Sequence, residues 1–115
     1  MSTFDWADYL TFAAEIAQRP DEAALRSAIS RAYYSAYCKA RNHLSQSGVN
    51  VRTSSHKWLW DNFRRSDDED IRSLGLTGDR LKMARNRADY DNVFSDLNSA
   101  VLTALPRARQ IVQAV

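Results

Sequence analysis

One uninterrupted stretch of the sequence, from Asp21 to Gln46, constrains the fold more than any other. It contains neither proline nor glycine, the two residues that most often break a helix. A single helix over this stretch is ~39 Å long, at about 1.5 Å per residue. In a chain of 115 residues, a helix of that length must have other helices packed along it.

Both sides of this predicted helix carry residues suited to contact rather than to open water. When the residues are plotted at about 100° each, one side forms an apolar stripe of Leu25, Ile29, Ala32, Tyr33, Ala36, Ala40 and Leu44. The other side mixes basic, aromatic and small residues, namely Ser27, Arg31, Tyr34, Cys38 and Arg41. The first side predicts a core contact, and the second predicts a surface that meets a partner.

The rest of the chain is also predicted to be helical. Apolar residues recur at three- and four-residue steps over residues 3–18, 56–65, 77–90 and 93–115. Glycine occurs three times and proline twice, which disfavours a turn-rich β fold. The sequence therefore predicts an all-α protein, an antiparallel up-and-down bundle of four to five helices that forms one domain over residues 1–115.

Helix ends are predicted from capping residues. The expected N-caps are Ser2 or Thr3 for the first helix, Asp21 for the long one, and Ser54 or Ser55 for the segment 56–65. In that last segment we expect Trp58, Leu59 and Phe63 to turn inward. Trp60 is not expected to do so.

Glycine and proline in the second half of the chain predict interruptions. Gly75 and Gly78 indicate a bend or break, so that a clean helix begins only at Thr77 or Asp79. Pro106 lies inside the last predicted helix. Because the apolar register continues through it, we expect a kink there rather than an end.

Charge and cysteine content exclude several functional classes. The net charge of +2 and a pI near 8.9 are only a weak indication of nucleic-acid binding. The lone cysteine, Cys38, excludes an internal disulfide, and two distant histidines give no metal site. The chain starts without the pattern of a signal peptide and has no apolar run near the ~20 residues of a membrane helix. We expect a cytoplasmic protein without metal, cofactor or membrane contact.

The strongest candidate site lies in the segment 84–91, ARNRADYD. Arg85 falls at the edge of the apolar stripe of its helix, and Asp89 follows one turn later on the same face. A part-buried guanidinium needs carboxylate, phenol or phosphate partners. Arg85 therefore has two possible roles. It either forms a structural ion pair that holds its helix against the tyrosines of the long helix, or its guanidinium is held in a cleft to bind phosphate or RNA. Composition alone favours the structural pair.

Aromatic residues and histidines are weaker candidates. Tyr33 and Tyr37 lean to the core side, which favours packing, whereas packing and base stacking both stay open for Tyr34. As a catalytic base, His43 or His56 would need a partner that the spacing does not supply.

Three segments together resemble the HEPN-domain proteins, most closely the small stand-alone prokaryotic kind. In that family a Ser-Arg-x-Tyr-Tyr helix is followed by a Ser-His-Lys helix start and an Arg-x-x-Ala-Asp-Tyr segment. This chain holds the same pieces in the same order, over roughly residues 6–115, as Ser30, Arg31, Tyr33 and Tyr34, then Ser55, His56 and Lys57, then Arg85, Ala88, Asp89 and Tyr90.

The resemblance implies a helical bundle that dimerises around a cleft. Many HEPN proteins are metal-independent ribonucleases, and many act as toxins beside a small nucleotidyltransferase antitoxin or in defence systems. Their nuclease motif is an arginine followed, after four to six residues, by a histidine. At that spacing after Arg85 this chain has Tyr90, Asp91 and Asn92, so the motif is absent. Tyrosine is a poor general base near neutral pH, since its ordinary pKa is about 10.

Three functional hypotheses follow. The first is a HEPN-like module, associated with RNA or nucleotides in a toxin–antitoxin or defence-type system, that forms a homodimer with a polar cleft around Arg85. The second is an active metal-independent ribonuclease toxin with a variant site, and the third is a non-catalytic helical adaptor. Once the resemblance is counted, a functional role for Arg85 is narrowly favoured. The candidate catalytic residues are Arg85, Asp89 and Tyr90, and the candidate binding residues are Arg31, Tyr34, His56 and Lys57.

Overall fold

The computed structural model describes residues 3–52 and 55–115, and over these residues the protein has five helices and no strand. The helices are α1 (Ala7–Ile16), α2 (Glu22–Gln46), α3 (His56–Arg64), α4 (Glu69–Tyr90) and α5 (Leu97–Ala114). The predicted all-α bundle is confirmed. None of these five helices has the length and apolar character needed to cross a membrane.

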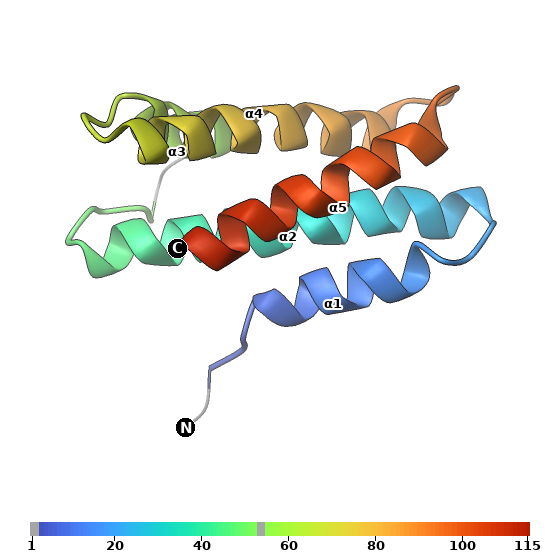
Figure 1. Cartoon of the computed structure of the whole chain (residues 1–115), viewed down its shortest axis with the longest axis horizontal. Helices are drawn as coiled ribbons and strands as arrows, with labels where there is room; N and C mark the ends of the chain where they lie inside the picture. Colours follow the sequence, from blue (N-terminus) through green and yellow to red (C-terminus); the bar gives the residue numbers. More distant parts are fainter. Residues whose placement is uncertain (1–2, 53–54) are drawn as a thin grey trace.

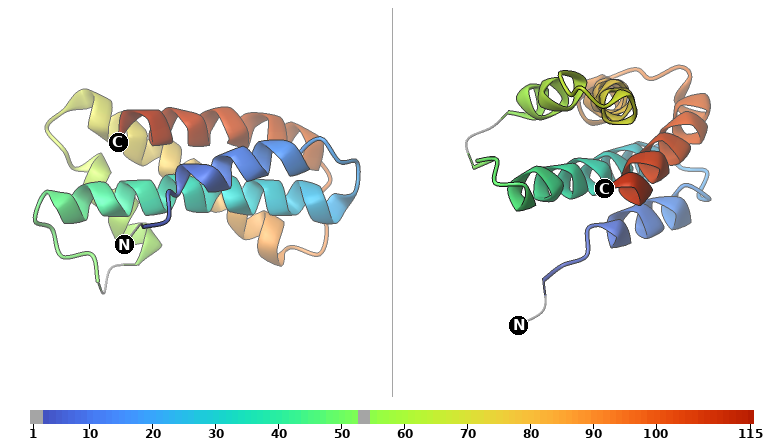
Figure 2. Two further views of the ribbon diagram at one scale, coloured as in Figure 1. Left: turned by 90° about the horizontal axis from the view of Figure 1, so that it is seen from below. Right: turned by 60° about the vertical axis from the view of Figure 1, so that its left-hand side comes forward.

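Helix α2 lies at the centre of the bundle, and each of the other helices contacts it. Figure 1 shows α1 on one side of α2, α3 and α4 together on the other, and α5 crossing α2 between them. The views in Figure 2 agree with this arrangement. Consecutive long helices are antiparallel, α1 with α2 and α4 with α5, whereas α2 and α5 run in the same direction. The predicted apolar stripe of α2 is buried from Leu25 to Ala40, and Asp21 caps the helix through Ala24 as expected.

The first and last helices are shorter than the sequence predicts. Helix α1 begins at Ala7, and the carboxylate of Asp5 accepts a hydrogen bond from the backbone nitrogen of Ala7 at 3.0 Å. The ring of Phe4 packs edge-on against Trp6 at 4.9 Å, which holds the preceding residues out of the helix. Helix α5 begins at Leu97 because Phe94 turns into the core. The expected cap Ser2 lies outside the described residues.

Two predictions about α3 and α4 are wrong, and for one shared reason. Trp60 is fully buried, and α4 continues without a break through Gly75 and Gly78. A Cβ atom on Gly78 would overlap the indole ring of Trp60, and one on Gly75 would come within 2.6 Å of Arg64 Cγ. The glycines therefore let α3 lie directly against α4 rather than breaking the helix.

A side chain from α2 closes the C-terminal end of α4. Arg26 Nη1 donates hydrogen bonds to the carbonyl oxygens of Ala88 at 3.0 Å and Asp91 at 2.6 Å. Carbonyls at a helix end lack partners within the helix. The same guanidinium pairs with Glu22 on α2 at 2.8 Å. Arg26 thus fixes the part of α4 that carries Arg85 against α2.

The N-cap of α3 and the continuity of α5 agree with the predictions from the sequence. The Ser55 hydroxyl accepts a hydrogen bond from the backbone nitrogen of Trp58 at 3.1 Å, so Ser55 is the cap of α3. The alternative cap, Ser54, lies outside the described residues. Helix α5 continues through Pro106, which confirms that the proline does not end the helix.

Substitution of Gly78 by alanine is expected to destabilise the fold by about 1–3 kcal/mol, although alanine is the better helix former. The added methyl group must displace the Trp60 ring. Urea denaturation measures the change, and Ser73→Ala, at an exposed position of the same helix, is the control. In a Trp60→Leu background the penalty should shrink. An unchanged penalty in that background would contradict the packing explanation.

Candidate functional site

Arg85 lies on the side of α4 that faces α2. Its guanidinium donates hydrogen bonds to the hydroxyl of Tyr34 and, at 2.7 Å, to Asn86 Oδ1. Its Nε atom is 3.2 Å from a carboxylate oxygen of Asp89, and the side chain is only 13% exposed. The ion pair with Asp89 and the link to a tyrosine of the long helix, both considered from the sequence, are present.

The ion pair of Arg85 is not an optimised structural pair. Arg85 Nε is the one buried side-chain nitrogen or oxygen, within the described part of the chain, that makes no hydrogen bond. Buried polar groups are nearly always satisfied. Burial opposes the charge of Arg85, but the hydrogen bond with Tyr34 and the nearby Asp89 outweigh burial and raise the pKa above its ordinary value. The site therefore holds a permanent positive charge, largely out of water, with hydrogen-bonding capacity unused.

The other two candidate catalytic residues are nearer to solvent. The side chain of Asp89 is 28% exposed and accepts a hydrogen bond from the Ser30 hydroxyl at 3.3 Å. Tyr90 is 74% exposed, and its ring centroid is 6.0 Å from the guanidinium carbon of Arg85. Water can therefore hydrate Asp89 if Arg85 forms an ion pair with another anion. Tyr90 lies at the outer edge of the site.

His56 joins Arg85 from a different helix. Its ring stacks on Tyr37, with centroids 4.0 Å apart and an interplanar angle of 10°. It also meets the edge of Tyr34 at 5.9 Å, the residue whose hydroxyl accepts from Arg85. A search for an arginine–histidine pair along the sequence could not find this arrangement, because α3 and α4 supply one residue each.

The hydrogen-bond pattern fixes the proton of His56. The Tyr33 hydroxyl accepts from Trp60 Nε1 at 3.1 Å and lies 2.7 Å from His56 Nδ1. Burial raises the pKa of Tyr33 well above its usual range, so the phenol keeps its single proton. We assign that proton to the hydrogen bond with His56 Nδ1, because the buried hydroxyl would otherwise leave its donor unpaired. The pKa of His56 is lowered by burial and then by the charges of Arg85 and Lys82. His56 is therefore neutral, with its proton on Nε2.

We call this group the tyrosine–arginine cluster; its members are Ser30, Tyr33, Tyr34, Tyr37, His56, Trp60, Arg85 and Asp89. The predicted binding residue Arg31 borders it, with its guanidinium carbon 5.4 Å from the Tyr34 ring centroid. Lys57 stands apart, because its exposed side chain pairs with Asp61 on its own helix at 2.6 Å. Of the predicted site residues, the structure therefore brings together all except Lys57, with Arg31 and Tyr90 at the margin.

Sequence reasoning missed the functions of Ser30 and Trp60 in this cluster. Ser30 lies one turn before Tyr34 on α2, so a helical plot could have placed it opposite Asp89. For Trp60 the available signal was the glycine at position 78, since a glycine inside a helix often marks the close approach of a large side chain.

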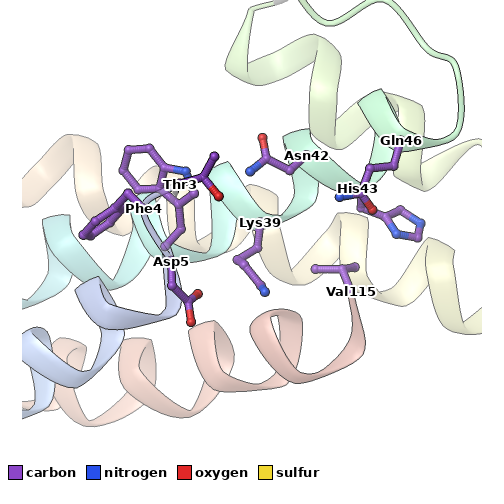
Figure 3. A pocket seen from close by; sticks show the side chains of 9 residues that line it. Thr3, Phe4, Asp5, Lys39, Asn42, His43, Gln46 and Val115 are labelled. Carbon is purple, nitrogen blue, oxygen red and sulfur yellow. The ribbon is translucent and has the colours of Figure 1, made fainter. Parts of the chain in front are cut away.

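A separate hollow of about 350 Å³ lies near the C-terminal end of α2. Figure 3 shows Lys39, Asn42, His43 and Val115 around it. None of the predicted site residues lines it, so it is not the candidate site. Within residues 3–52 and 55–115, no three histidine, cysteine or acidic residues are grouped so that they could hold a metal ion.

Comparisons with known proteins identify no family. No protein-family model matches the chain, and neither a curated protein nor a solved structure matches it.

The free energy of unfolding is expected to fall as the pH decreases from about 7 toward the lowered pKa of His56. The unfolded chain takes up a proton at the ordinary histidine pKa near 6.5, whereas the folded chain takes it up only at lower pH. The unfolded state holds more protons in that window, so stability rises with pH there and is complete above about 6.5. His56→Gln should flatten the dependence in urea denaturation. Equal flattening by His43→Gln would contradict the assignment.

Proposed function

We propose that this chain is a HEPN-like module that binds the phosphate of RNA or of a nucleotide at the tyrosine–arginine cluster and does not cut the strand. The resemblance carried by residues 30–34, 55–57 and 85–90 supports this proposal. One structural observation supports it most. The charged guanidinium of Arg85 is held against phenol rings at 13% exposure, and its buried Nε–H makes no hydrogen bond.

The cluster has the chemistry of a phosphate site. A guanidinium offers a planar fork of donors that matches phosphate oxygens. The Tyr34 hydroxyl and the neutral Nε2–H of His56 add hydrogen-bond donors without adding a second buried charge. The one carboxylate of the cluster, Asp89, is part-exposed, so water can satisfy it when a phosphate takes its place beside Arg85.

Binding is favoured over cleavage because the cluster lacks a ready general base. RNA cleavage without a metal requires a base to remove the 2′-hydroxyl proton. His56 Nδ1 accepts from Tyr33, and Nε2 carries the proton, so neither nitrogen is free to accept another. Asp89 is engaged by Arg85 and Ser30.

An active ribonuclease is the second candidate, and the position of His56 favours it. Arg85 and His56 border the same Tyr34 ring, which gives an arginine–histidine pair across two helices in place of the missing sequence motif. To act as the acid, His56 would first have to take up a second proton, because the N–H of a neutral imidazole is too weak an acid, and a base would have to come from elsewhere. Cleavage of RNA that persists in the presence of a chelator and disappears in His56→Gln would select this candidate.

The biological setting that we propose is a cytoplasmic toxin–antitoxin or defence-type system. This part of the proposal is supported by the resemblance, which also implies a small nucleotidyltransferase antitoxin as the partner protein. A gene for such a nucleotidyltransferase next to the gene for this chain would support the pairing.

We further propose a homodimer with the polar cleft around Arg85 between protomers. The surface expected to meet the partner is the α2 face with Arg31, Tyr34, Cys38 and Arg41. Within one chain, Arg31 lies over the Tyr9 ring, and Cys38 is already buried, with only 4% of its surface exposed. Helix α1 therefore covers part of this face, and a partner would meet the remainder.

Light scattering at tens of micromolar protein is expected to give the mass of a dimer. Burial raises the pKa of the Cys38 thiol, which keeps it protonated and unreactive, so Cys38→Ala should leave both mass and ligand binding unchanged. A monomer at these concentrations would contradict the dimer proposal.

Arg85→Gln is expected to weaken RNA or nucleotide binding by more than tenfold, because a bidentate charged contact is lost. Its effect on unfolding should be about 1–2 kcal/mol, since Asp89 and Tyr34 are both accessible enough to be hydrated. Fluorescence anisotropy with labelled RNA and urea denaturation measure the two quantities. Arg80→Gln, an exposed arginine on the same helix, is the control.

A large loss of stability without any ligand binding would show that Arg85 and Asp89 form a purely structural ion pair. A loss of about 3–5 kcal/mol on Arg85→Gln, the size typical of breaking a buried pair, with no RNA or nucleotide affinity in the wild-type protein, would support the non-catalytic adaptor.

A further inference from the structure

A second basic hollow continues from the cluster along α2. It has a volume of about 510 Å³ and is lined by Tyr37, Arg41, Ser45 and residues 49–52. Tyr37 belongs to both places, because its ring stacks on His56 and the residue also lines the hollow. The hollow and the cluster are therefore neighbours that share one side chain.

The two arginines of this hollow carry charge that no carboxylate among residues 3–52 and 55–115 neutralises. Arg41 reaches only the side-chain oxygen of Asn42, at 3.4 Å, and the ring of Trp6. Neither Arg41 nor Arg52 forms an ion pair with any residue of the described chain. An uncompensated pair of guanidinium groups beside a hollow favours a polyanionic ligand.

The spacing of the two sites decides what kind of anion can reach both. Tyr34, which bonds to Arg85, and Arg41 lie on the same face of α2, because seven residues make nearly two turns. Their backbone positions are about 10 Å apart along the helix axis, a separation that suits two phosphate groups better than one. A strand with successive phosphates can contact both.

The burial of the rings indicates that the strand is held by its backbone. Tyr37 is only 7% exposed and already stacks on His56, so its ring offers no free face to a base. Arg85 is recessed, which a flexible single strand can enter more readily than a stiff duplex. Contacts to phosphates carry no sequence information.

We infer that the ligand is single-stranded RNA, bound along α2 with one phosphate at Arg85 and a later phosphate at Arg41 and Arg52. This inference rests on the proposed function and deepens it, since it selects an RNA strand over a mononucleotide. Binding is then independent of base sequence and depends strongly on salt.

The test compares uridine monophosphate, a single-stranded oligouridylate of about eight nucleotides, and a duplex of the same length, by fluorescence anisotropy over a range of salt concentrations. The single strand should bind at least tenfold more tightly than either alternative. The variant Arg41→Gln/Arg52→Gln should weaken single-strand binding about tenfold. It should also reduce the slope of log K against log salt by about 1.4, since each phosphate contact to a single strand contributes about 0.7.

The matched control removes two charges from α5, which lines neither site, as Arg107→Gln/Arg109→Gln, and should keep the wild-type slope. Circular dichroism and light scattering check that fold and mass are unchanged. If the double variant does not fold, Arg52→Gln alone, at an exposed position, carries the test with an expected slope change of about 0.7.

Two results would overturn the inference and leave the proposed function standing. One is single-strand binding that Arg85→Gln abolishes and Arg41→Gln/Arg52→Gln leaves unchanged. The other is binding of the mononucleotide or the duplex as tightly as the single strand. An absence of binding by all three ligands would overturn the inference and the proposed function together.

Discussion

The burial of α2 by four other helices is the constraint on which the rest of the structure depends. A helix enclosed in this way keeps little of an ordinary solvated face, so the polar side chains that it buries must find partners on its neighbours. Three tyrosines follow closely in its middle. The hydroxyl of Tyr33 is met by Trp60 and His56 from α3, and that of Tyr34 by Arg85 from α4, while the Tyr37 ring stacks on His56. The candidate site is thus a result of the way in which the bundle satisfies its central helix.

The same enclosure explains what the sequence could predict and what it could not. Relations within one helix were predictable, because periodicity places Arg85 beside Asp89 and turns Tyr33 and Tyr37 inward. Relations between helices were not. The sequence spacing gives no sign that α3 delivers His56 to Tyr33, since that depends on how closely α3 approaches α4. Two glycines set that approach, and a single sequence does not distinguish a packing glycine from a helix-breaking one.

The two ends of the proposed binding surface differ in physical character. At one end, Arg85 is buried, bonded to Tyr34 and fixed by the clamp that Arg26 makes on the end of α4. At the other end, Arg41 and Arg52 have no carboxylate partner within the described residues. A preorganised charge that is largely buried loses little conformational entropy when it binds, whereas arginines without a carboxylate partner attract an anion from a distance. The end with Arg41 and Arg52 is suited to capture, and the end with Arg85 to retention.

The close contact between Gly78 and Trp60 has a consequence for genetics. Trp60 donates to the Tyr33 hydroxyl, and that hydroxyl sets which nitrogen of His56 carries the proton. A methyl group on Gly78 would displace the indole and so disturb a chain of hydrogen bonds that ends in the candidate site. In a saturation screen for loss of activity, Gly78 would therefore score with the site residues, although it has no side chain and contacts no ligand. The sensitive positions found in such a screen would therefore extend from the candidate site through Trp60 to Gly78 on α4. They would mark residues that support the site by packing as well as residues that bind the ligand.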